Sequence, residues 1–357
     1  MRRLLHLAVL PVTVLILAGI VWAVGFEKTK AAVENAGAGA FVAVGVVSAL
    51  FIIFQAVAWA LLNRPIKHHV PFRTLVGGTI VGQAGNIMTP STYLGGEAFR
   101  VAYVGRLAKL PYHEVAGAVV LSKYLEFVSF ILLLSFSTLV AAVQYREELF
   151  GRHLWGGVGM LAVAALSLGF GVVLWVSLVR RRRPLTRLVG WLARLRPLTR
   201  KLVRLRGQTA KMEDQVSRVF CEEGAISLAS FGMLLASHAL IFTKPMVFFL
   251  LAGGHLRLNL GQLCLIFAAG QLILAVQIFP SGAGMFDGGL LGTFAILGLD
   301  EGMCMAYLLC LRLWDAVVIG AGVFLGARIG TRILSTEAVS AVPNAQEPNS
   351  PPELPSP

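Results

Sequence analysis

Three long stretches of the chain contain almost no ionisable side chain, and this feature limits the possible fold more than any other. They are residues 4–24, in which His6 is the one exception, residues 37–62 and residues 154–179. Each is long enough for an α-helix to cross the hydrocarbon of a bilayer, which takes roughly 20 residues. A soluble protein can bury one such helix in its core but hardly three. The sequence therefore predicts an all-α, polytopic integral membrane protein.

The composition supports the same class. Of the 357 residues, 57% are hydrophobic and 14% are charged, whereas a soluble domain carries about 25% charged residues. Arg2 and Arg3 precede the first apolar stretch, as in a secretory signal peptide. That stretch is too long for a signal peptide, and the chain after it is equally apolar. We therefore expect it to remain as the first transmembrane helix.

The cysteines and glycines form no recognisable metal or cofactor motif. The cysteines, which lack CxxC spacing and are expected to be small buried apolar residues, are Cys221, Cys264, Cys304 and Cys310. Four glycines lie in an apolar helix rather than after a strand, and predict close helix packing instead of a dinucleotide site: Gly320, Gly322, Gly326 and Gly330. No metal, cofactor or catalytic residue is predicted.

The net charge of +13 is concentrated in one block. Residues 180–211 contain twelve Lys and Arg residues and no acid, interleaved with leucines. A nucleic-acid-binding tail is one interpretation. However, the block follows directly on an apolar stretch, which favours a basic amphipathic helix on the cytoplasmic membrane face that attracts anionic lipid headgroups. We expect membrane lipids, and no nucleic acid, as partners.

The positive-inside rule then decides how the chain is threaded. If the glycine- and proline-rich segment 74–104 crossed the membrane, the basic block would lie outside. If that segment enters and turns back, the block lies inside, so a re-entrant segment is predicted. The result is about six full transmembrane helices plus two broken segments, 74–104 and 260–299, in the inner (plasma) membrane, with both termini cytoplasmic.

This threading also divides the chain. Residues 1–334 form one transmembrane domain, in which 180–223 is a basic cytoplasmic loop. Residues 335–357 are rich in Pro, Ser, Asn and Glu and are expected to be a disordered tail.

The two broken segments share a sequence pattern. Each has a Pro-Ser pair, five residues and an acid, followed about 25 residues later by a cation and a second acid three positions apart. The first copy is Pro90, Ser91, Glu97, Lys123 and Glu126, and the second is Pro280, Ser281, Asp287, Arg312 and Asp315. Because the threading enters the first segment from inside and the second from outside, this predicts an inverted repeat whose broken helices meet at a site near the midplane.

Charged groups at this depth need partners, because each costs about 3 kcal/mol or more in the bilayer. We expect Glu97, Arg100, Asp287 and Arg312 to approach one another near the centre. These groups either bind a substrate or coupling ion, or form structural ion pairs between helices. Lys244 lies late in its helix, and is expected to extend towards the membrane surface.

At these residues the chain resembles the flippase-like family of the lysylphosphatidylglycerol synthase transmembrane domain, over most of residues 1–334. The motif positions that carry the resemblance are Asn86, Pro90, Gly96, Glu97, Arg100, Pro280 and Asp287. The family usually has Glu-Arg-x-x-Asp on the next helix, where this chain departs with Ser122, Lys123 and Glu126, and Asp287 stands where Glu is commoner. The resemblance implies a protein that moves a polar-headed lipid between leaflets. Lysyl transfer is not expected, since the chain after the last helix is short.

The leading hypothesis is therefore a flippase or transporter for an anionic or polyprenyl-phosphate lipid, and not an enzyme. The alternatives are a membrane-embedded enzyme that modifies a lipid, with the same acids as general base, and a scaffold that recruits such an enzyme through the basic loop. The predicted substrate-binding residues are Asn86, Pro90, Ser91, Glu97, Arg100, Lys123, Glu126, Pro280, Ser281, Asp287, Arg312 and Asp315.

Overall fold

The structure is a computed structural model and describes residues 26–63, 70–89, 95–147, 222–253, 256–275 and 284–340, with scattered positions between 162 and 210 and Gly282. Every helix or strand assigned within these residues is a helix. The expected first transmembrane helix, most of the apolar stretch 154–179 and most of the basic block lie outside the described residues.

The described helices follow one order twice: long, short, short, long. The first set is α2 (Phe26–Asn63), α3 (Phe72–Met88), α4 (Glu97–Leu107) and α5 (Tyr112–Gln144). The second set is α9 (Gly224–Leu251), α10 (Leu260–Ala275), α11 (Met285–Ile296) and α12 (Glu301–Ser340). In each set the two short helices correspond to one of the broken apolar segments.

The four long helices α2, α5, α9 and α12 are long and apolar enough to cross a membrane. For three of them the candidate spans are Val115–Gln144 of α5, Gly224–Leu251 of α9 and Glu301–Arg328 of α12. The fourth, α2, begins at Phe26 and bends at Gly37, whose φ of 69° lies outside the helical range. Helix α12 continues to Ser340, past the boundary expected at residue 334.

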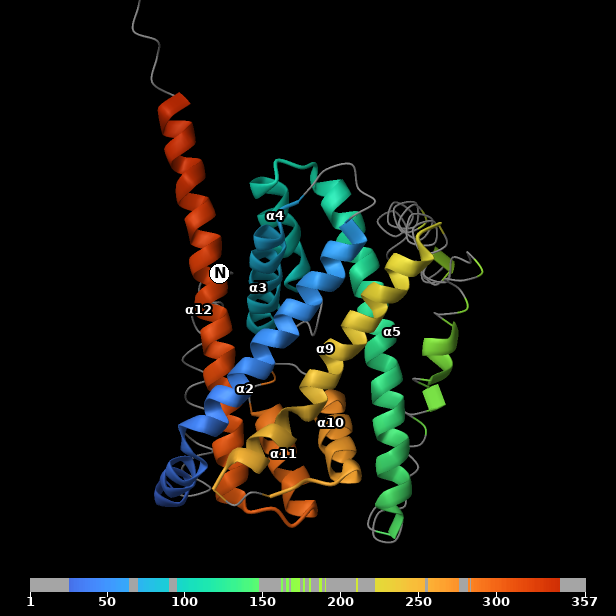
Figure 1. Ribbon diagram of the computed structural model, residues 1–357, viewed down its shortest axis with the longest axis vertical. Coiled ribbons are helices and arrows are strands. Elements are labelled where there is room, and N and C mark those ends of the chain that lie inside the picture. The colour runs from blue at the N-terminus through green and yellow to red at the C-terminus, as the bar shows by residue number, and fades with distance from the viewer. Residues whose placement is uncertain are drawn as a thin grey trace, which may run out of the picture.

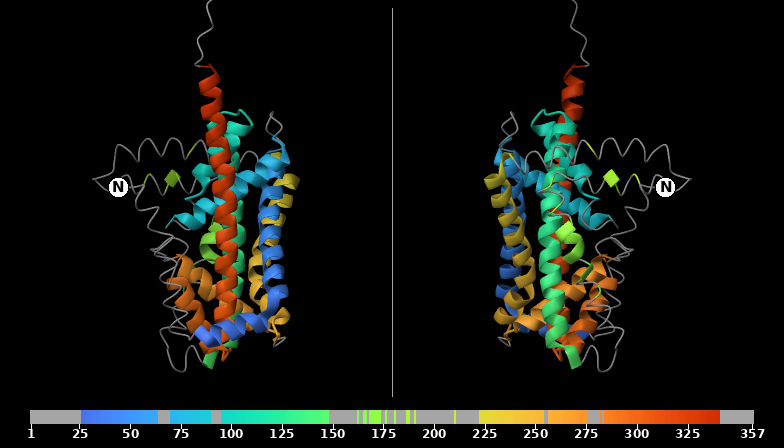
Figure 2. Two further views of the ribbon diagram at one scale, coloured as in Figure 1. Left: turned by 90° about the vertical axis from the view of Figure 1, so that its left-hand side faces the viewer. Right: turned by 90° about the vertical axis from the view of Figure 1, so that its right-hand side faces the viewer.

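The short helices lie at opposite ends of the bundle. Figure 1 shows α3 and α4 beside the upper parts of the long helices and α10 and α11 beside the lower parts, and the side views of Figure 2 show the same two levels. The short helices α3, α4, α10 and α11 have 17 or fewer residues each, and α10 and α11 are apolar along their length.

The two sets of helices pack into one another. The first helix of one set, α2, lies along the first helix of the other, α9; α3 packs against α12, and α10 correspondingly packs against α5. The first short helix of each set is therefore covered by the last long helix of the other set. Because of this exchange, the two sets of helices form a single bundle.

Close contacts between helices depend on small residues, which leave room for a side chain of the neighbouring helix. Trp314 of α12 lies directly on Gly45 of α2, and its indole N–H donates to the Phe41 carbonyl at 2.9 Å. Of the α12 glycines expected to mediate packing, Gly322 lies against Ala84 of α3, whereas Gly320 and Gly326 have no neighbour within 4 Å of an added Cβ. Where lipid replaces water, such packing is what holds helices together.

Candidate functional site

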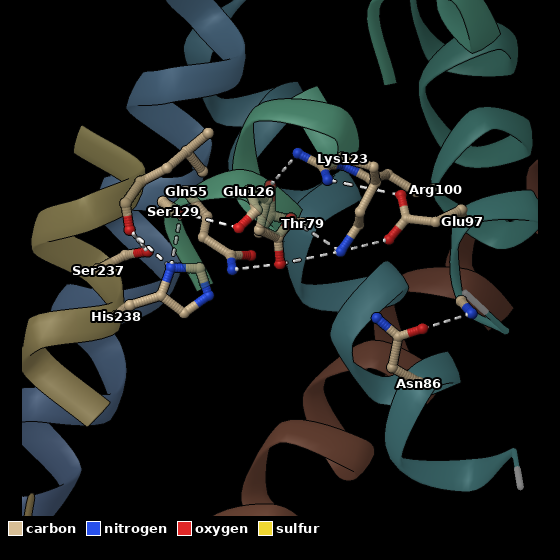
Figure 3. A network of polar contacts seen from close by, with 12 residues as sticks. Gln55, Thr79, Asn86, Glu97, Arg100, Lys123, Glu126, Ser129, Ser237 and His238 are labelled. Carbon is tan, nitrogen blue, oxygen red and sulfur yellow. Dashed lines mark hydrogen bonds and ion pairs between the residues drawn. The ribbon is translucent and has the colours of Figure 1, made fainter. Parts of the chain in front are cut away.

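The first group of charges joins the two helices that follow the first break. The Lys123 ammonium, on α5, lies 3.0 Å from a carboxylate oxygen of Glu97, the first residue of α4, and 2.9 Å from Glu126 one turn further on (Figure 3). Arg100 lies 3.6 Å from the other Glu97 oxygen. The repeat pattern thus forms a triad in which one cation bridges two acids.

This first triad is closed off by neighbouring polar groups. The Gln55 side chain of α2 donates to Glu126 at 3.1 Å, and Arg100 donates to the Thr79 hydroxyl at 3.4 Å. The Arg100 guanidinium, only 2% exposed, also stacks 3.9 Å above the Trp59 ring. Four helices therefore surround these charges, which makes this triad the inner, buried one.

Buried His238 of α9 lies beside the same network. Its Nδ1 is 3.0 Å from both the Ser129 hydroxyl and the Leu234 carbonyl (Figure 3). The Ser129 hydroxyl donates to the Glu126 backbone carbonyl. The sequence interpretation missed Gln55 and His238, although an isolated polar residue in an apolar helix is the signal that marks such partners.

Asn86 fixes the turn of the first break. Its side-chain oxygen accepts the Gly96 N–H at 2.8 Å, so α3 and α4 are held together across the gap between them. A Cβ on Gly96 would overlap the Gly82 carbonyl of α3. Glycine is therefore required where the two backbones touch.

The second triad repeats the first with different residue types. Arg312 of α12 donates through Nε and Nη2 to the Asp287 carboxylate at 2.8–3.0 Å, and through Nη1 to Asp315 at 3.2 Å. Asp287 also accepts the Gly284 N–H at the start of α11, where Gly284 has a φ of 80°. The helix start after the second break is thus tied to the cation.

The two triads correspond residue by residue: Glu97 to Asp287, Lys123 to Arg312 and Glu126 to Asp315. In each, the acid in the first turn of the second short helix binds the cation of the following long helix, and that cation binds the acid three residues later. The structure brings Glu97 to Arg100 and Asp287 to Arg312. Among the described residues it shows no ion pair between the first pair and the second.

A cavity of about 220 Å³ lies between the two breaks. The end of α3 contributes Gln83 and Asn86, the start of α11 contributes Phe286, and α12 contributes Arg312 and Asp315. The second triad is open to this space: the Asp315 side chain is 36% exposed, against 7% for its counterpart Glu126. The two halves therefore differ in that only the second presents its charges to the cavity.

Lys244 departs from the expectation that it extends to the membrane surface, because its side chain lines this cavity. The reason is the packing of α9 across the bundle interior, which helix length could not reveal. Four predicted site residues, Pro90, Ser91, Pro280 and Ser281, lie outside the described residues.

The described cysteines are free, buried thiols within the helix bundle: Cys264, Cys304 and Cys310. Within the described ranges, no group of three or more His, Cys, Asp and Glu side chains is arranged to hold a metal ion. The acids of the two triads instead form ion pairs with lysine and arginine side chains.

The long apolar helices, the two short pairs and the charged groups inside the bundle define the class: a multi-pass α-helical membrane protein with a largely apolar cavity that a few charged side chains reach. Residues 4–322 match the family described as the lysylphosphatidylglycerol synthase TM region, and the chain belongs to that family. The resemblance inferred from the motifs is thereby confirmed.

One relative is described as a "UPF0104 membrane protein" of Methanothermobacter thermautotrophicus. It is 21% identical over 332 residues, which make up 90% of this chain and 96% of that protein. The similarity thus extends over nearly the full length of both chains. No solved structure gives a significant match.

Proposed function

We propose that this protein moves a polar-headed lipid between the two leaflets of the membrane, with the headgroup passing through the central cavity and the acyl chains remaining in the bilayer. The observation that carries the proposal is the cavity between two broken segments, with a matching acid–cation–acid triad after each break. Such a site near the midplane is how transporters built from repeats hold their substrates.

We further propose that the short pairs α3–α4 and α10–α11 are re-entrant and belong to an inverted repeat. The twofold helix order, the placement of the pairs at opposite ends and the exchanged packing support this arrangement. Movement of one set of helices against the other would expose the cavity to each side in turn, as in alternating access. In this threading both termini are cytoplasmic, in the inner membrane.

The paired charges suit a transporter better than an enzyme. An acid that acts as general base needs to reach a reacting group, whereas Glu97 and Asp287 are each held by a cation. Ser129 and His238 are in contact but buried, and each also bonds to a backbone carbonyl. We therefore assign the chain no enzymatic reaction, and propose that residues 180–211 bind anionic headgroups on the cytoplasmic face.

A leaflet-specific assay tests the proposal. The full-length protein is placed in liposomes that contain fluorescent phospholipids with a panel of headgroups, and a membrane-impermeant quencher reports the fraction exposed outside. We expect faster exchange for some headgroups than in protein-free liposomes. Glu97→Gln and Asp287→Asn should abolish this exchange while the protein still inserts and folds. A folded Glu97→Gln protein that moves lipid at the normal rate would contradict the proposal.

A further inference from the structure

Lys244 is the cation of the cavity that has no acid at ion-pair distance among the described residues. Its side chain lines the cavity together with Arg312 and Asp315. Arg312 is bound by Asp287 and Asp315, at 2.8 Å and 3.2 Å, so its charge is already compensated. The Lys244 ammonium is attracted by Asp315 but is not paired with it in the described part of the chain.

The residue after Lys244 frees a backbone carbonyl beside the cavity. Pro245 follows it inside α9 and has no N–H, which leaves the carbonyl of Ile241 without its usual helical donor. Ile241 and Pro245 both line the cavity. Gln83 and Asn86, which also line the cavity, carry amide groups that can donate hydrogen bonds.

An unpaired ammonium inside a membrane is expensive, and such residues mark the paths of substrates and ions. Among the described residues no acid pairs with Lys244, so an anionic substrate that enters the cavity can serve as its counter-ion. A phosphodiester carries a single negative charge, which matches one ammonium, whereas a doubly charged phosphate would be repelled about twice as strongly by Asp315. A volume of about 220 Å³ holds several water molecules and thus admits a small headgroup, but it has no room for two acyl chains.

We propose that the cavity binds the phosphodiester group of a phospholipid, with the Lys244 ammonium as its counter-ion and the amides of Gln83 and Asn86 as hydrogen-bond donors. This inference rests on the proposed function and names the chemistry of its substrate. The headgroup enters the cavity between the end of α3 and α9, and the glycerol and chains point out of the bundle.

Thermal stabilisation of the purified full-length protein in detergent tests this assignment. The probes are dihexanoyl phosphatidylglycerol, dihexanoylglycerol, which lacks the phosphate, and inorganic phosphate. We expect stabilisation by the first probe alone. Equal stabilisation by dihexanoylglycerol would overturn the phosphate site, and equal stabilisation by inorganic phosphate would show a free-anion site instead of a lipid site.

Variants at the lysine sharpen the test. Lys244→Gln should weaken the binding of dihexanoyl phosphatidylglycerol by at least roughly tenfold, and Lys244→Arg, which keeps the charge, should preserve most of it. Without lipid, Lys244→Gln should melt at or above the wild-type temperature, because the substitution removes a charge without an ion-pair partner in the described structure. The control is Lys28→Gln, which removes an exposed ion pair with Glu301 and should leave lipid binding unchanged.

The failure of this inference is distinguishable from failure of the proposed function. If Lys244→Gln binds the phospholipid as tightly as the wild type, the Lys244 site is wrong, whether or not the protein moves lipid. If the wild type binds the phospholipid through Lys244 but exchanges no lipid in liposomes, the binding site is correct and the proposed transport function is wrong.

Discussion

At the residue scale, the two triads have the same connections but different surroundings. Glu126 is buried, accepts a hydrogen bond from Gln55 and pairs with Lys123. Asp315 pairs with Arg312 but faces the cavity. The cost of removing a charge depends on whether water can solvate the partner left behind.

The two equivalent acids should therefore respond differently to neutralisation. Glu126→Gln leaves the Lys123 charge in a buried site and should cost about 3–5 kcal/mol of stability. Asp315→Asn should cost about 1 kcal/mol or less, because water reaches this partly open site; Arg312 keeps its Asp287 pair just as Lys123 keeps its Glu97 pair, so the exposure makes the difference. Chemical unfolding in detergent of the two variants beside the wild type measures the difference. Similar losses for both would contradict the distinction between a closed and an open triad.

At the element scale, the breaks depend on backbones that approach more closely than a side chain allows. Gly96, at the start of α4, lies against the Gly82 carbonyl of α3, and Asn86 bonds across the same contact. Glu97 is the first residue of α4, so the packing of α4 against α3 decides whether the first triad forms.

Gly96→Ala should disrupt this pair. The added Cβ must displace backbone instead of a flexible side chain, so the loss of stability should be about 1–3 kcal/mol or more. The matched control is Gly320→Ala in α12, where an added Cβ has no neighbour within 4 Å, and which should be neutral or slightly stabilising. Thermal unfolding of both variants measures the effect, and equal melting temperatures would show that the close contact is unimportant.

At the scale of the whole molecule, the two sets of helices share one interior. Helices α2 and α9 pack along each other, and the first short helix of each set, α3 or α10, packs against the last long helix of the other set. Neither half can therefore enclose the cavity alone, which is why the site needs the complete bundle.

The threading of this bundle predicts which positions are accessible from outside the cell. Cysteine introduced at Thr199, in the basic block, should resist a membrane-impermeant thiol reagent in intact cells and react after the membrane is opened. Leu256→Cys, in the exposed connection after α9, should react from outside, since α9 ends on the opposite side. External labelling at Thr199 would overturn the re-entrant arrangement of α3 and α4.

The sequence by itself determined the class of protein, the existence of the long apolar helices and the members of both triads. These features are local. The length of an apolar stretch decides whether its helix can cross the membrane, and a cation and an acid three positions apart lie on the same face of a helix. The matching spacing in the two halves also indicated which acid belongs with which cation, and the ion pairs follow that pattern.

Only the tertiary structure decided that the two triads pair separately, that Gln55 and His238 adjoin the first, and that Lys244 lines the cavity. The contacts of Gln55 and His238 join residues 71 and 109 positions apart, and they depend on how far each helix is rotated about its axis. A uniformly apolar helix has no polar stripe that fixes this rotation. It is set by packing against neighbouring helices, such as Trp314 on Gly45, and that information exists only once the bundle has assembled.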